Sequence, residues 1–144
     1  MRDGISGSAT EADVIGIRVP AELAQLTMLR ALAETVALIG DFALDEVTDI
    51  RVALDEVATA LILGSVPGGV IECDFGYNDN RMSIRVGTVV SEPDALDEGG
   101  FGWHVLQTLT DSIGVRTESF DPVAGGFPTV VRFSRRRGEY DERG

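Results

Sequence analysis

A glutamate on the back of a helical segment is the first residue in this sequence that is placed to do chemistry. The spacing of apolar residues predicts a helix over residues 44–63, with Glu56 on the side opposite the core-facing Val47. Small and apolar residues flank this glutamate: Val52, Ala53, Ala60 and Leu63. Such surroundings suit a general acid or base that lines a pocket. A partly exposed surface glutamate accounts for the same pattern without any chemistry.

A glycine-rich run before a third helical segment is the second such feature. Gly99, Gly100 and Gly102 come directly before Trp103. Glycines let backbone N–H groups approach a ligand, and the start of a helix attracts anions. The run therefore predicts an anion-binding turn, while a flexible loop that ends at a helix start is the alternative.

The composition excludes several other kinds of site. The 144 residues include 12 basic and 24 acidic side chains, a net charge of −12, which disfavours nucleic acid as a direct partner and favours a basic one. All the cations are arginines, so lysine Schiff-base chemistry and a P-loop are excluded. Cys73 and His104 are each the only residue of their type, so we expect no disulfide and no metal site. We interpret Cys73 as a core residue and His104 as a packed or partly exposed residue at a helix start.

The chain shows no pattern typical of export or of membrane insertion. It does not open on a basic stretch followed by an apolar run. Its longest uncharged stretch, residues 57–71, is too short to span a bilayer and contains Pro67. A single cysteine fits a reducing compartment. We expect a cytoplasmic protein of one domain, without a membrane partner.

The elements that must position Glu56 and the glycines follow from hydrophobic periodicity. The pattern predicts a strand at 14–19, helices at 21–39 and 44–63, strands at 70–77 and 82–90, a helix at 101–113, and strands at 115–120 and 129–134. Helices on one face of a mostly antiparallel sheet make an α+β fold, a two-layer sandwich. We expect the folded domain to span residues 13–134, with a loose tail at 1–12 and a solvated charged tail at 135–144.

Three segments, in this order, resemble the GHKL (histidine-kinase-like) ATPase superfamily. The family's helix with a catalytic or metal-positioning glutamate is resembled by DIRVALDEVATALILGSVP. Its second glycine box is resembled by GGFGWHVLQTLTDSI, and its closing Gly-x-x-Thr strand by GGFPTVVRF. Residues 13–134 as a whole look like the anti-sigma-factor branch, the bacterial serine-protein kinases that hold sigma factors inactive. The resemblance implies a catalytic role for Glu56 and nucleotide-binding roles for Gly100, Gly102 and Thr129.

The sequence departs from that family at two nucleotide-binding positions. Four residues after Glu56 the family carries an asparagine that binds magnesium, whereas this chain has Ala60, which offers no ligand atom. In its first glycine box the family has an aspartate that reads the adenine, whereas this chain has Thr88. We therefore expect ATP and Mg²⁺ to bind weakly if at all, and no cofactor is assigned.

The resemblance and these departures together predict a binding module. It is an anti-sigma factor that sequesters a sigma factor and is released by an anti-anti-sigma partner of the STAS type. An active ATP-dependent serine-protein kinase of the same fold, acting on the anti-anti-sigma factor, is the alternative. A ligand-sensing domain that holds some other small molecule is a third interpretation. Members of this branch often form dimers, so the resemblance also implies a homodimer as one assembly.

The first helix carries the expected contact with the sigma factor. Counting back from Asp41 places Arg30 where the family has an arginine that contacts sigma, with Thr27 and Glu34 beside it on the polar side of the helix. An ion pair between Arg30 and Glu34, one turn apart, is the alternative. Because arginine is common at the centre of protein interfaces, we expect these three residues to bind the partner.

Overall fold

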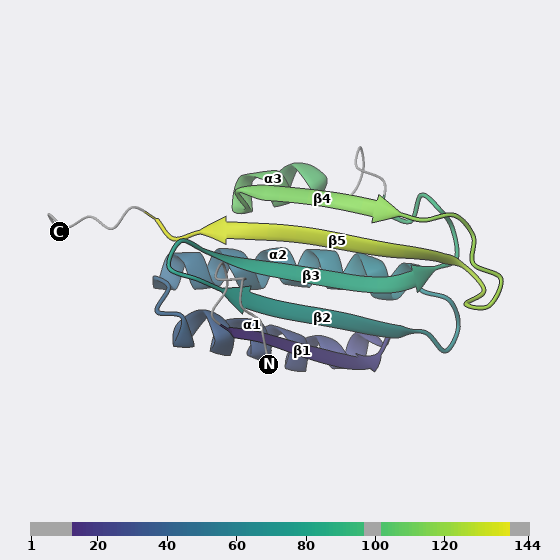
Figure 1. Cartoon of the computed structure of the whole chain (residues 1–144), viewed down its shortest axis with the longest axis horizontal. Coiled ribbons are helices and arrows are strands. Elements are labelled where there is room, and N and C mark those ends of the chain that lie inside the picture. The colour runs from purple at the N-terminus through teal and green to yellow at the C-terminus, as the bar shows by residue number, and fades with distance from the viewer. Residues whose placement is uncertain (1–12, 97–101, 139–144) are drawn as a thin grey trace, which may run out of the picture.

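The computed structural model describes residues 13–96 and 102–138 and folds them into a five-stranded sheet with helices on one face (Figure 1). In chain order the elements are β1 (Asp13–Pro20), a 3-10 turn (Leu23–Gln25), α1 (Leu26–Ile39), α2 (Leu44–Gly64), β2 (Val70–Tyr77), β3 (Arg81–Val90), α3 (Trp103–Leu109), β4 (Ser112–Thr117) and β5 (Phe127–Arg136). The predicted α+β two-layer fold is confirmed.

All neighbouring strands of this sheet are antiparallel, in the order β1-β2-β3-β5-β4. The predicted hairpin between β2 and β3 is present, and the Asn78 side-chain oxygen accepts the backbone N–H groups of Asn80 and Arg81 at 2.7 and 2.9 Å. Such a bond within the turn fixes the register of the two strands. The helices all lie behind the sheet in Figure 1, so the described residues leave its other face open.

The core lies between the sheet and the two long helices. Alternate strand positions point toward the apolar sides of α1 and α2, as the period of two requires. Each large side chain buried there contributes roughly 1.5–3 kcal/mol relative to an exposed one. The largest fully buried side chains include Phe75, Leu29, Ile50, Leu54, Leu61 and Ile71. This packing holds α2 against the sheet and fixes which of its residues face away from the core.

The predicted end of the third helix is wrong. The sequence pattern extends it to residue 113, but α3 ends at Leu109, and Thr110 is extended with φ −124° and ψ 159°. Ser112 and Ile113 pair with β5 instead, so the strand expected at 115–120 lies at Ser112–Thr117. Pairing between distant strands outweighs the local helical spacing here.

The C-terminal boundary also differs from the prediction. β5 continues to Arg136, so the charged tail expected at 135–144 begins inside the sheet. Arg137 is held as well: its guanidinium donates to the carbonyl oxygens of Asp41 and Gly40 at 2.7 and 2.9 Å and lies 4.1 Å from the centroid of the Phe42 ring. These contacts fasten the end of β5 to the turn between α1 and α2. The tail expected at 1–12 lies outside the described residues.

Candidate functional site

The side of α2 that faces away from the core lines a cavity of about 680 Å³. One wall is α2, and the opposite wall is the segment that follows β3, residues 91–95. Glu56 and Ala60 lie on the α2 wall, four residues and therefore about one helical turn apart. Both are partly exposed, so their side chains are accessible to a ligand. Glu56, which the sequence pattern predicts to line a pocket, therefore lines a cavity in the structure.

Gly102 approaches Glu56 from the start of α3. A Cβ atom built on Gly102 would lie 2.9 Å from Glu56 Oε1, a distance that a side chain could take only if something moved. Gly102 also has a φ of +44°, in the left-handed region that favours glycine. The fold thus brings together the catalytic and the glycine positions that the resemblance implies. Gly100 lies outside the described residues.

Thr129 and Thr88 lie elsewhere. They are opposite each other on β5 and β3, and both are buried. The Thr88 hydroxyl donates to the carbonyl oxygen of Val70 at 2.7 Å, and that of Thr129 donates to the carbonyl oxygen of Phe127 at 3.0 Å. Both threonines line a separate groove of about 410 Å³ and do not line the cavity beside Glu56. The Thr88 hydroxyl thus joins β3 to β2, whereas that of Thr129 is bonded within β5.

The cavity beside Glu56 is acidic. Among the residues that the structure describes, four carboxylates line it, those of Asp55, Glu56, Glu92 and Asp94, and no basic residue does. One of them, Asp55, is neutralised by Arg30, whose Nε is 2.8 Å from Asp55 Oδ1. Within the described lining, a polyphosphate would therefore meet three carboxylates that no cation neutralises, and Ala60 offers no ligand atom for a metal ion.

The three residues expected to contact a partner lie on and beside this acidic wall. Arg30 pairs with Asp55 of α2, and Glu34 pairs with Arg51 of α2 at 2.9 Å, so the alternative ion pair between Arg30 and Glu34 is wrong. Thr27 is exposed on α1. Because Asp55 also lines the cavity, the surface around Arg30 is continuous with the cavity mouth. Any protein that covers this part of α1 would lie next to Glu56.

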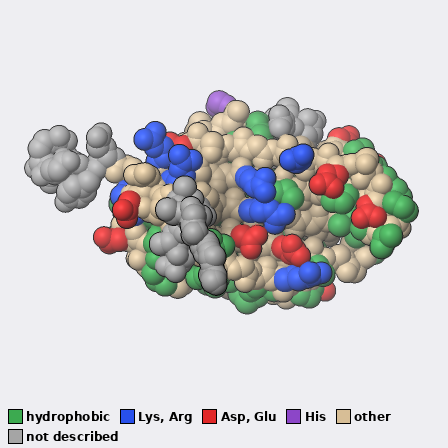
Figure 2. All heavy atoms as spheres, viewed as in Figure 1, with side chains coloured by type: hydrophobic (Ala, Val, Ile, Leu, Met, Phe, Trp, Pro, Cys, Tyr) green, Lys and Arg blue, Asp and Glu red, His purple; other side chains and the backbone are tan. Residues whose placement is uncertain are grey.

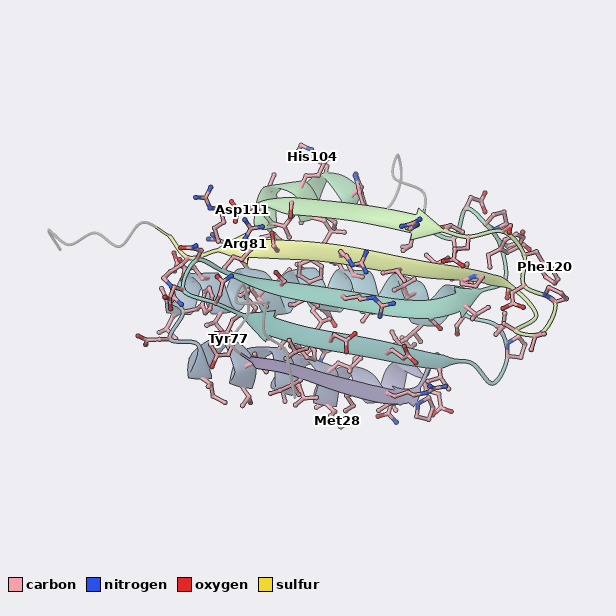
Figure 3. All side chains as sticks on the ribbon, viewed as in Figure 1. Met28, Tyr77, Arg81, His104, Asp111 and Phe120 are labelled. Carbon is pink, nitrogen blue, oxygen red and sulfur yellow. The ribbon has the colours of Figure 1, made fainter. Side chains whose placement is uncertain are left out.

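The remaining reactive residues take no part in this site. His104 is exposed and points away from the sheet on the outer side of α3 (Figure 3). Cys73 is fully buried, and burial raises the pKa of its thiol to about 12, which confirms it as a core residue. Across residues 13–96 and 102–138, no group of three or more metal-ligating side chains comes together. Among the same residues, no helix is long and apolar enough to cross a membrane.

Sequence reasoning did not find the acidic character of the cavity. Glu92 and Asp94 belong to a loop that looks like ordinary solvated charge, and only the fold places them opposite α2. The ion pair between Arg30 and Asp55 joins residues 25 positions apart, so local spacing carried no signal for it. The position of Asp55 directly before Glu56 was the one hint available.

Known proteins support the resemblance. No protein-family model matches the chain. The anti-sigma-F factor RsbW of Mycobacterium tuberculosis (strain ATCC 25618 / H37Rv) is 27% identical over 123 residues, which cover 85% of this chain and 73% of that protein. The serine-protein kinase RsbW of Bacillus subtilis (strain 168) is 25% identical over 134 residues, and the match covers 78% of this chain and 84% of that protein. The fold places the glutamate and the glycine turn close together, and over most of its length the chain is similar in sequence to the RsbW proteins, the anti-sigma-F factor and the serine-protein kinases.

Proposed function

We propose that this chain is an anti-sigma factor that binds and sequesters a sigma factor, and that an anti-anti-sigma partner of the STAS type releases it. The name of the mycobacterial relative, anti-sigma-F factor, supports the first half of this proposal. The cytoplasm is the expected setting, because a sigma factor acts there. A homodimer is the expected assembly on the strength of the resemblance alone.

One observation carries the choice of a binding module over an enzyme: Ala60 and four carboxylates, Glu56 among them, line the cavity, and the lining residues that the structure describes include no cation. A lost metal ligand at Ala60 costs on the order of 1–3 kcal/mol. That loss weakens nucleotide binding by roughly one to two orders of magnitude. Binding of a protein partner to α1 requires none of these groups.

The alternative is an ATP-dependent serine-protein kinase, the activity named for the Bacillus relatives. The contact between Glu56 and Gly102 favours it, since a carboxylate held beside a glycine turn is what a general base for phosphoryl transfer would need. The acidic lining argues against it, because a serine hydroxyl that gave its proton to Glu56 would have no phosphoryl donor to attack unless a nucleotide were bound.

The partner is identified first, by capture from the native cytoplasm and mass spectrometry, and its binding is then measured by calorimetry with and without ATP and Mg²⁺. The proposal expects tight binding of a sigma factor that does not change with nucleotide, and an ATP dissociation constant far weaker than micromolar. Glu56→Gln should leave sigma binding unchanged, since the glutamate is not needed for it. Tight magnesium-dependent ATP binding, with phosphate transferred to a serine of the anti-anti-sigma factor, would establish the kinase instead.

A further inference from the structure

The open face of the sheet is basic, in contrast to the protein as a whole. Strand alternation and register place six arginines and two carboxylates on it, which leaves this face four charges positive in a chain of net charge −12. The space-filling view shows basic side chains across the middle of this face (Figure 2). The arginines are Arg18, Arg81, Arg85, Arg116, Arg132 and Arg136, and the carboxylates are Glu72 and Asp74.

Two pairs of these arginines lie directly opposite each other across β3 and β5. Arg85 faces Arg132, and Arg81 faces Arg136. Like charges in directly opposed positions of an antiparallel pair destabilise the sheet. Only Arg85 among the four has a carboxylate partner on this face, Asp74 Oδ2 at 3.3 Å, within the part of the chain that the structure describes. The fold therefore tolerates an unneutralised charge at both pairs.

A trough of small residues separates the two arginine pairs. Its floor is the row Gly76, Ser83, Ser134 and Ser112, in which adjacent residues are cross-strand neighbours. The Ser112 and Ser134 hydroxyls are 2.7 Å apart, and the trough encloses about 370 Å³. Because the pairs are four residues apart along β3, the arginine walls are roughly 13 Å apart. We call this feature the arginine trough.

We propose that the arginine trough binds an extended acidic segment of a partner protein. An extended chain laid across the strands directs successive side chains to opposite sides, so carboxylates at successive positions would reach opposite arginine walls. Arginine is suited to this role, since its guanidinium binds a carboxylate through two parallel hydrogen bonds. The serine hydroxyls and the absence of bulky side chains on the floor leave room for the partner's backbone.

Two other occupants fit the observations less well. A nucleic acid would be repelled by the net charge of −12, and its affinity depends on neutralising many phosphates. A second copy that packed the same face against this one would bring two basic faces together. The trough lies on the opposite side of the sheet from Glu56 and Arg30, so the proposal does not depend on the function proposed above.

The test uses the full-length chain and a fluorescent peptide of about eight consecutive glutamates, which spans roughly 26 Å when extended and directs carboxylates to both sides. Fluorescence anisotropy should show binding that weakens as salt is raised. The double variant Arg81→Gln/Arg132→Gln removes one arginine from each wall and leaves no carboxylate unpaired. It should bind roughly tenfold more weakly. Arg51→Gln, which removes a positive charge from the helix side, is the control for the loss of charge away from the trough and should bind as the wild type does.

Backbone amide shifts locate the peptide independently of affinity, and they should change most at Ser83, Ser112 and Ser134. No binding, equal binding by the double variant, or shifts confined to the helix side would overturn the proposal. Tighter binding of a single-stranded oligonucleotide of equal charge at the same residues would assign the trough to nucleic acid and overturn it too. Self-association of the wild type that the double variant abolishes would also overturn the proposal. Peptide binding that appears only after residues 1–12 are removed would overturn it as well.

Discussion

Arg30 of α1 and Asp55 of α2 form an ion pair at 2.8 Å, and one turn further along α1 the charges are reversed, with Glu34 2.9 Å from Arg51 of α2. Each helix thus contributes one cation and one carboxylate. All four side chains are between 37% and 42% exposed, so each pair adds at most about 1 kcal/mol to stability. Arg30 is therefore available to a partner without being essential to the fold.

Arg30→Glu should greatly weaken sigma-factor binding while changing stability little. It reverses the charge at the expected contact and places a carboxylate beside Asp55, so we expect a loss of about 2–5 kcal/mol in binding if the contact is buried. The free energy of unfolding should fall by no more than about 1 kcal/mol. Calorimetry with the sigma factor and urea denaturation measure the two effects.

A charge swap separates a contact with the partner from a role inside the protein. Arg30→Asp combined with Asp55→Arg restores the ion pair but moves the cation to α2. If Arg30 contacts the sigma factor, the swapped protein should fold normally and still bind poorly. Recovery of full affinity would show that Arg30 serves only to join the helices.

Ala60→Asn should strengthen magnesium-dependent ATP binding. It returns a ligand oxygen to the cavity wall one turn from Glu56, and Ala60 is partly exposed, so the larger side chain has room. We expect a gain of about 1–2 kcal/mol, or roughly tenfold in affinity. Thr59→Asn, on the neighbouring position of the same cavity wall, is the control. An equal gain from both variants would mean that a polar group anywhere on the wall suffices.

Gly102→Ala should cost about 2–3 kcal/mol of stability, in two separable parts. The left-handed φ of +44° accounts for about 1–2 kcal/mol, and the approach of the new methyl group to Glu56 accounts for the rest. Gly125→Ala is matched for the first part alone, since Gly125 has φ +79° and a methyl group added there would meet nothing within 4 Å. In thermal denaturation, Gly102→Ala should have a lower melting temperature than Gly125→Ala. Adding Glu56→Ala to Gly102→Ala should remove most of that difference.

Arg137→Ala should lower the free energy of unfolding by about 1–3 kcal/mol. The variant loses the hydrogen bonds to Gly40 and Asp41 and the contact with the Phe42 ring. Arg136→Ala removes a neighbouring arginine whose side chain is exposed, and it should change stability by less than about 0.5 kcal/mol. Urea denaturation that gave equal losses for both would contradict a specific role for Arg137.

The Cys73 thiol should resist alkylation in the folded protein. Burial raises its pKa from 9.0 to about 12, so the thiolate that reacts is scarce and also inaccessible. Because the folded pKa is the higher one, the thiol's contribution to stability is complete below pH 9 and is lost as the pH rises toward 12. Labelling followed by mass spectrometry should show modification only in denaturant, and labelling of native protein at pH 8 would contradict this.

The fold was largely predictable because its hydrophobic periods are strong. The long helices and the β2–β3 hairpin lie within a few residues of the predicted ranges. The end of the short third helix could not be predicted, because Ser112 and Ile113 pair with β5, and local spacing does not reveal that partner. At the site, Glu56 could be found from its apolar surroundings, whereas Glu92 and Asp94 acquire meaning only once the fold places them across the cavity.

Trp103 directly follows the glycine that contacts Glu56, and it is the sole tryptophan of the chain, 8% exposed. An indole shielded from water emits at shorter wavelength than a solvated one, so the tryptophan emission of this protein reports on the environment at the start of α3. Any event that opens the junction between α2 and α3, whether a partner arriving at α1 or a ligand entering the acidic cavity, should therefore shift that emission. Trp103 is therefore an intrinsic fluorescent probe of the site, one residue away from the glycine that lies beside Glu56.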